Sequence, residues 1–404
     1  MHVNDLPVEL LSEIFAFATF EKRLAPNNLN TSHLLVFFHK KSAPFNLIHV
    51  CQHWRIVALL HPSLWAYLDG TQYKAFQPSV SAVAFWLQCS RSVPLRFRIS
   101  SRNDKTKSLF NPHHARQMLL LFSRHLYRWT SLSLEAGNDL AIDFLAVLRE
   151  SGCHLPPLEA LEVELGCGDI KECISEELAA SFCNMKTLRQ IYWVNAWGHA
   201  LPRLPWGQYN TVYNRSSFTP EEILECVAQC TSSKSISIQG LEILERPIML
   251  SNLPHTSLMH LTSLTLDQSS DPLPFLSCFT LPTLRHLEIR LYQREFRLLE
   301  EFLQRSKCPL QDLTVIDTTL SAVDVANFFN LQGLQSIKNV KLVPTHREAE
   351  MVRFLKYFEG TCVRLPPLMA WRESISEWPL LIGWKENNLH RVRYLLKNGK
   401  LTTR

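Results

Sequence analysis

Apolar residues near the start of the chain recur with the period of a helix. Within residues 5–18 the apolar positions that share one helical face are Leu10, Leu11, Ile14, Phe15 and Ala18. The spacing predicts a second helix over residues 45–60, ended by the His61-Pro62 pair, and then a short turn over Pro62–Trp65. Helices this short and this apolar leave apolar surface uncovered, so a binding partner is expected.

A different pattern fills most of the remaining chain, where an L-x-x-L-x-L core recurs with polar residues between the apolar ones. It is found at Trp129/Leu132/Leu134, Leu158/Leu161/Val163, Leu188/Ile191/Trp193, Leu261/Leu264/Leu266, Leu284/Leu287/Ile289, Leu310/Leu313/Val315 and Ile337/Val340/Leu342, and more weakly at Ser233/Ile236/Ile238. The central positions lie 23 to 30 residues apart, except for one gap of 45 residues. Helical stretches fill the gaps, and similar strand and helix signals precede the first copy at residues 95–99 and 77–90.

Such spacing is typical of leucine-rich repeats, in which each strand–helix unit stacks on the next to make one continuous core. The 45-residue gap contains residues 197–213, rich in Pro, Gly and aromatics, and is interpreted as an inserted loop. Its aromatics, with Trp193, are either interaction anchors or part of the repeat core. The competing interpretation of the whole region is an irregular α/β domain with leucine-rich strands.

In this interpretation the polar residues beside the apolar ones point to the open face of the strands. This face is the candidate substrate-binding surface, with candidate residues Glu162, Glu164, Tyr192, Asp267, Glu288 and Arg290. The alternative is that they are ordinary solvated strand residues.

The N-terminal segments LPVELLSEIF and VCQHWRIVALLHPSLW together resemble the F-box, in the form common in fungal F-box proteins. The matching features, in chain order, are Leu6-Pro7, Glu9, Ile14-Phe15, Val50-Cys51, Trp54-Arg55 and Leu64-Trp65. The resemblance covers about 60–65 residues. The leucine-rich pattern that follows is a second likeness to F-box proteins, many of which continue into divergent leucine-rich repeats that select a substrate.

The resemblance implies a three-helix unit that docks on the Skp adaptor of a cullin–RING ubiquitin ligase. The residues it places on the adaptor face are Leu6, Pro7, Leu10, Leu11, Ile14, Val50, Cys51, Trp54 and Leu64. The alternative is that aromatic residues such as Trp54 only hold the helices together. Two features depart from the family pattern: the stretch over residues 21–44 is longer than in compact F-boxes, and the asparagine ladder typical of leucine-rich repeats is absent.

The expected organisation is therefore an F-box domain over residues 1–70 with an inserted loop at about 21–44, a divergent leucine-rich-repeat region over 77–362, and a C-terminal cap over 363–404. The fold class is α+β or α/β: a three-helix F-box followed by an irregular strand–helix solenoid.

Composition narrows the cellular setting. The chain has 404 residues, of which 46% are hydrophobic and 20% charged, as expected of a folded protein. The net charge of +5 is too small to indicate nucleic-acid binding without clustering. No apolar run reaches the ~18 residues that a membrane span needs, and the first residues are acidic and polar where a secretion signal is basic and then apolar. A cytoplasmic or nuclear protein, not secreted, is expected, with no nucleic-acid or membrane partner.

The sequence offers no set of residues for chemistry. It lacks the phosphate-loop, dinucleotide, serine-hydrolase and zinc-protease motifs. Its eleven cysteines include no CxxC pair and are expected to be reduced thiols. His49 and His53, one helical turn apart, are the weak alternative of a metal site. We expect no catalytic residue, cofactor or metal.

Three hypotheses follow. The first is a substrate receptor of a Skp–cullin–F-box ubiquitin ligase; the second is an F-box scaffold that binds partners without directing ubiquitination; the third is an enzyme, to which no residue pattern points. The sequence leaves open which substrate is bound, whether its recognition requires phosphorylation, and the choice between cytoplasm and nucleus.

Overall fold

The computed structural model describes residues 6–20, 44–69, 79–100, 112–150, 156–165, 172–195, 202–216, 220–240, 255–267, 273–291, 296–317, 328, 331–334 and 337–344. Residues 21–43 of the loop predicted over 21–44 and the whole cap predicted over 363–404 lie outside these residues. The chain divides into two compact units, Met1–Tyr209 and Asn210–Arg404. No helix within the described ranges is long and apolar enough to cross a membrane.

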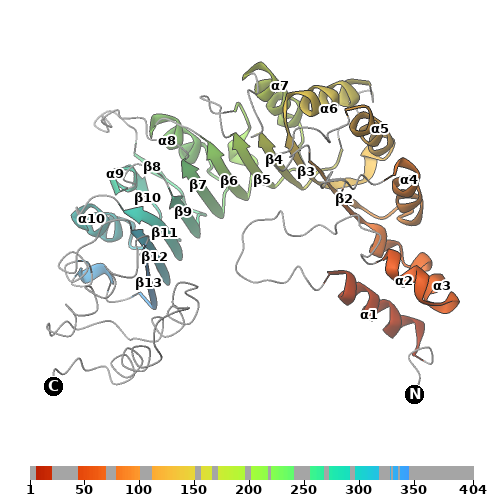
Figure 1. Ribbon diagram of the computed structural model, residues 1–404. Helices are drawn as coiled ribbons and strands as arrows, with labels where there is room; N and C mark the ends of the chain where they lie inside the picture. Colours follow the sequence, from red (N-terminus) through yellow and green to blue (C-terminus); the bar gives the residue numbers. More distant parts are fainter. Residues whose placement is uncertain are drawn as a thin grey trace, which may run out of the picture. The chain divides into compact units, whose positions relative to one another are not determined.

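The first unit begins with short helices (Figure 1). They are α1 (Val8–Phe20), α2 (Phe45–Val50), α3 (Gln52–Leu60) and the 3-10 helix η4 (Pro62–Trp65). The prediction of one continuous helix over residues 45–60 is wrong, because Cys51 is extended, with φ −157° and ψ 172°. The Cys51 thiol accepts a hydrogen bond from the Trp54 backbone N–H at 3.4 Å, so it caps α3 and separates it from α2.

A parallel sheet follows the helices in the first unit. Its strands, which pair in chain order, are β1 (Tyr67–Asp69), β2 (Leu95–Ser100), β3 (Trp129–Ala136), β4 (Ala160–Leu165) and β5 (Gln190–Asn195). The central apolar positions of the predicted motif are register partners, since Leu132 pairs with Leu161 and Leu161 with Ile191. All three are at most 2% exposed, so the repeated leucines stack into one core.

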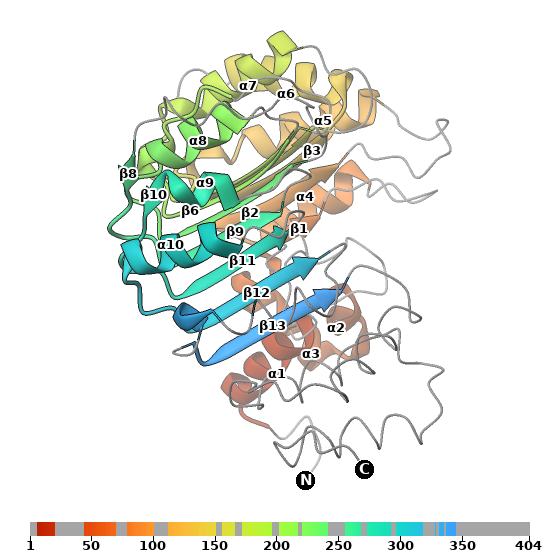
Figure 2. The same ribbon diagram turned by 90° about the vertical axis from the view of Figure 1, so that its left-hand side faces the viewer.

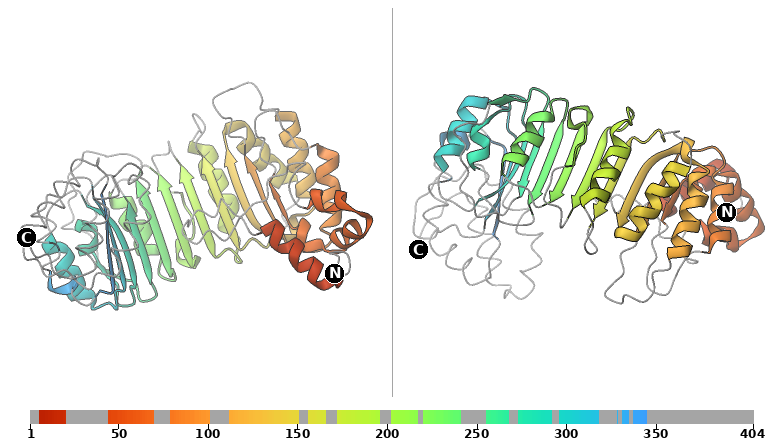
Figure 3. Two further views of the ribbon diagram at one scale, coloured as in Figure 1. Left: turned by 60° about the horizontal axis from the view of Figure 1, so that its bottom comes forward. Right: turned by 90° about the horizontal axis from the view of Figure 1, so that it is seen from above.

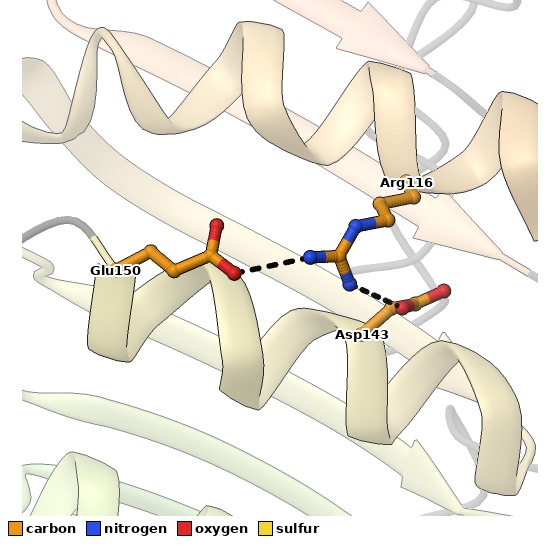
Figure 4. Close-up of polar contacts among 3 residues, drawn as sticks. All are labelled: Arg116, Asp143 and Glu150. Carbon is orange, nitrogen blue, oxygen red and sulfur yellow. Dashed lines mark hydrogen bonds and ion pairs between the residues drawn. The ribbon is translucent and has the colours of Figure 1, made fainter.

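Helices cover one face of this sheet, and Figure 3 shows them over the strands in the view from above. They are α4 (Val80–Cys89), α5 (Pro112–Ser123), α6 (Asn138–Glu150) and α7 (Glu172–Cys183), with 3-10 turns η5 (Leu126–Arg128) and η6 (Trp206–Gln208). Arg116 on α5 reaches two carboxylates of α6, those of Asp143 at 2.9 Å and Glu150 at 3.0 Å (Figure 4). The ion pairs thus join neighbouring helices outside the apolar core.

The second unit repeats this arrangement (Figure 2). Its parallel strands, in sheet order, are β6 (Thr211–Ser216), β7 (Ser235–Gly240), β9 (Ser263–Asp267), β11 (His286–Leu291), β12 (Asp312–Asp317) and β13 (Asn339–Pro344). The helices are α8 (Pro220–Gln229), α9 (Leu273–Ser277), α10 (Phe296–Ser306) and the 3-10 helix η8 (Gln332–Leu334). Strands β8 (Thr256–Ser257) and β10 (Phe279–Thr280) form a separate parallel pair.

Strand β6 corrects the interpretation of the 45-residue gap as an inserted loop. Val212 of β6 occupies the central position of the motif: it pairs with Ile236 of the next repeat and is 1% exposed, so the gap contains a complete strand. The third apolar position of the motif is occupied by Asn214, which is fully buried and accepts a hydrogen bond from Ser216 Oγ at 3.2 Å. A polar residue at that position removed the signal on which the sequence pattern depends.

The aromatic residues of the same segment divide between the two interpretations left open. Trp193, Trp206 and Tyr209 are at most 1% exposed and belong to the core. Tyr213 is half-buried on β6, and its hydroxyl donates to Gln239 Oε1 at 2.7 Å. Trp197 lies outside the described residues. The fold is therefore α/β, built of stacked parallel strand–helix repeats that are compatible with a solenoid.

Candidate docking surfaces

One row of apolar side chains on α1 is exposed. Leu10, Ile14 and Phe17 are 53%, 47% and 58% exposed and follow one another at helical spacing. We call these three residues the α1 stripe. The neighbouring face of the same helix is buried, with Leu11 and Phe15 at 0% exposure. Because one face satisfies the core, the α1 stripe is apolar surface available to a partner.

Exposed apolar residues also occur on the two following helices. Val50 at the end of α2 is 57% exposed, and Ile56 and Leu60, one turn apart on α3, are 49% and 58% exposed. The predicted set omitted Phe17, Ile56 and Leu60. The signal that would have found them is the helical spacing itself, since Phe17 lies three residues after Ile14 and Leu60 four after Ile56.

Two residues of the predicted adaptor face lie in the core instead. Leu11 and Leu64 are 0% exposed, so neither side chain is available to a partner in this conformation. The structure divides the single apolar face predicted for this helix: a helix turns about 100° per residue, and Leu11 is buried while its neighbour Leu10 is exposed. Contact of Leu11 and Leu64 with an adaptor stays a prediction, and in this structure both side chains are packed in the core.

The remaining predicted residues are half-buried, except for Pro7. Leu6 is half-buried and Pro7 is exposed, just before α1. Cys51 and Trp54 are half-buried, and the Trp54 ring packs against Phe15 with ring centroids 4.9 Å apart. Trp54 thus joins α1 to α3, and the exposed members of the predicted set are Pro7, Leu10, Ile14 and Val50.

The sheet of the first unit has a second, polar surface on the face away from the helices. Register partners across it are Arg98, Ser133, Glu162 and Tyr192. Glu135 lies two residues after Ser133 on β3. Its carboxylate forms an ion pair with Arg98 Nη2 at 2.9 Å and accepts a hydrogen bond from Ser100 Oγ at 2.7 Å.

The predicted residues on this face differ in accessibility. Glu162 is 8% exposed and Glu135 only 4%, whereas Glu164 and Tyr192 are half-buried. Burial raises the pKa of the Glu162 carboxyl, and the hydrogen bond with Ser133 and the charge of Arg98 oppose that rise. Glu164 and Tyr192 are therefore more accessible to a partner than Glu162.

The second unit carries the remaining predicted residues on neighbouring strands. Asp267 on β9 forms an ion pair with Arg290 on β11, and both are half-buried. Glu288 lies beside Thr265 and Thr314 in register. His286 on β11 and Asp312 on β12 are register partners, and His286 Nδ1 lies 2.6 Å from Asp312 Oδ2. This sheet face is polar, and much of its charge is paired within the protein.

The described residues show no metal-binding cluster beside these surfaces. Within the described ranges no group of three or more His, Cys, Asp or Glu is placed to hold a metal ion. Comparison with protein-family models gives no match, and comparison with curated proteins gives none. The arrangement presents two kinds of candidate docking surface: apolar on the N-terminal helices and polar on the sheet faces.

Proposed function

We propose that this protein is the substrate-recognition subunit of a Skp–cullin–F-box ubiquitin ligase. In this proposal helices α1–α3 form an F-box that docks on the Skp adaptor, and the sheet faces of the leucine-rich repeats bind the protein to be ubiquitinated. The chain carries out no reaction itself. It holds a substrate close to the ubiquitin-conjugating enzyme and so raises the effective concentration of the reacting groups.

The observation that carries the proposal is the α1 stripe. Leu10 and Ile14 belong to the F-box-like segment, and in the structure they are about half exposed while their neighbours Leu11 and Phe15 are buried. An exposed apolar row on a short helix is stabilised by a partner that covers it. The parallel strands add support, because they present polar faces that the repeat helices leave open.

A second function fits the same surfaces. The chain could act as a scaffold that binds the adaptor or another partner without directing ubiquitination. The two functions differ in the fate of the bound partner, which is turned over by a ligase and not by a scaffold. Measuring partner turnover in cells with and without cullin inhibition distinguishes them.

The test of adaptor docking is a pulldown of the full chain with purified Skp adaptor. The test variant is Leu10→Asp combined with Ile14→Asp, which places two charges on the α1 stripe without entering the core. The matched control is Ile142→Asp on α6, where the side chain is 52% exposed, almost the same as Leu10.

We expect the wild type and the Ile142→Asp control to retain the adaptor and the double variant to lose it. Circular dichroism and a thermal melt verify that all three proteins fold. Failure of the folded wild type to bind the adaptor contradicts the proposal, as does retention by the folded double variant.

A further inference from the structure

Four aromatic rings join the N-terminal helices to the first repeat. Phe45 begins α2, Trp65 ends η4, and Phe85 and Trp86 are neighbours on α4. The ring centroids of Trp65 lie 5.7 Å from Phe45, 5.2 Å from Trp86 and 5.7 Å from Phe85. We call these four residues the aromatic joint. They combine side chains from both sides of the boundary expected near residue 70.

Directional hydrogen bonds cross the same boundary. Trp86 Nε1 donates to the Trp65 carbonyl oxygen at 2.6 Å, and Trp65 Nε1 donates to the Ala58 carbonyl oxygen at 2.8 Å. Both indoles are 0% exposed, so water does not compete for these bonds. The bonds connect α4 to η4 and η4 to α3 in sequence, and each fixes the orientation of a flat ring.

Strand β1 makes a third connection. It follows η4 at once and pairs in parallel with β2, where Tyr67 is opposite Arg96 and Leu68 opposite Phe97. The Arg96 backbone N–H also donates to the Ala66 carbonyl oxygen at 2.9 Å. Leu68 is 1% exposed. The first strand of the repeat sheet therefore follows the helical segment with only Ala66 between η4 and β1.

We propose that the aromatic joint is rigid and that Trp65 and Trp86 are positioning residues, which fix the direction of the α1 stripe relative to the repeat sheet of the first unit. A buried, bonded junction resists bending, whereas domains joined by an exposed linker move relative to each other. The functional consequence rests on the proposed function: an adaptor on α1 and a substrate on the sheet are then held at a fixed separation.

The test is a distance measurement by pulsed electron spin resonance on the full chain, without any adaptor. Spin-labelled noncanonical residues replace Ala18 on α1 and Glu176 on α7, two exposed positions in the first unit. The variants are Trp86→Phe and Trp65→Phe, each of which keeps an aromatic ring but removes the indole N–H donor. Because each substitution is small, at least one of the two is expected to fold.

The matched control is Trp129→Phe on β3. Trp129 is 1% exposed, and its Nε1 donates to the Phe122 carbonyl oxygen at 3.2 Å, so this substitution removes the same kind of bond away from the aromatic joint. If loss of an indole hydrogen bond affects only stability, Trp129→Phe loses stability like the other variants. The distance distribution between the two spin labels then stays as in the wild type.

We expect one narrow distribution for the wild type and for Trp129→Phe, and a broader distribution for Trp86→Phe or Trp65→Phe. A broad or double distribution in the wild type overturns the proposal, as does a narrow distribution in every folded joint variant. The result is independent of the adaptor pulldown. A narrow wild-type distribution without adaptor binding supports the rigid joint and rejects the ligase function. A broad wild-type distribution with adaptor binding rejects the rigid joint and supports adaptor docking.

Discussion

The carboxyl of Glu162 lies in surroundings that favour its protonated form. Its side chain is almost fully buried on the polar sheet face, and the charges of Glu164 and Glu135 add to the effect of burial in raising its pKa. Arg98 lowers the pKa of Glu162 in turn, but its guanidinium is bound to Glu135. An ionised Glu162 therefore costs free energy in the folded state.

The raised pKa of Glu162 predicts that Glu162→Gln changes the stability of the protein by an amount that depends on pH. A raised folded pKa means that the stability linked to the proton is fully present below the unfolded pKa near 4.5 and is lost as pH rises through the folded value. Gln has no proton to lose, so the variant should be more stable than the wild type at pH 7. The gain should shrink as the pH falls towards 4.5.

Urea unfolding of the full chain at several pH values measures this difference. The exposed Glu159→Gln provides the control, for which no such trend is expected. A Glu162→Gln variant that is less stable than the wild type at pH 7 would show that the ionised carboxyl stabilises the sheet face instead.

At the candidate docking surface of α1, the sequence predicts a helix but not which of its apolar residues are exposed. The helical pattern correctly identified the apolar residues of α1, including Leu10 and Ile14. It did not separate those from Leu11, because leucine is equally suited to a core and to an interface. Only the packing of α1 against α3, through Phe15 and Trp54, determines which face remains exposed.

At the scale of elements, arginines donate hydrogen bonds to the carbonyl groups at the ends of neighbouring helices. Arg128, in η5, is 5% exposed and donates to Ser90 Oγ at 3.0 Å and to the carbonyl oxygens of Val93 and Leu87, both at 3.3 Å, at the end of α4. In the second unit Arg305 of α10 donates to the carbonyl oxygen of Leu276 of α9 at 2.7 Å. Each arginine satisfies carbonyl groups that a helix end leaves without a helical partner.

We predict that Arg128→Met lowers the free energy of unfolding by about 2 to 4 kcal/mol, because several buried acceptors lose a charged donor. Denaturant unfolding of the full chain, followed by far-UV circular dichroism, gives the value. The control is the exposed Arg124→Met, expected to change stability by less than about 0.5 kcal/mol. An equally small change in Arg128→Met would mean that water replaces the guanidinium at the end of α4.

The elements themselves were largely predictable where the apolar period was intact. Strands such as β3, β4 and β12 follow from their leucines, because stacking in register requires the same apolar position in every repeat. Two of the departures from prediction have local causes. Asn214 hid β6, and the extended Cys51 divided a helix whose apolar period runs through it.

At the scale of the whole molecule, two kinds of surface occur on one chain. The apolar α1 stripe and the polar sheet face both belong to the first unit, where β1 and the aromatic joint connect their supporting elements. Sequence could indicate both surfaces, since each follows from a local period. It could not indicate their connection, which depends on contacts between Trp65 and Trp86, 21 residues apart.

The central claim is that the N-terminal helices dock an adaptor, and hydrogen exchange tests it most directly. The full chain is compared with and without purified Skp adaptor. We predict slower exchange in residues 8–20 and 45–60 when the adaptor is present, and unchanged exchange in strands β3–β5. Unchanged exchange in both helical segments at saturating adaptor, or protection confined to the repeats, would contradict it.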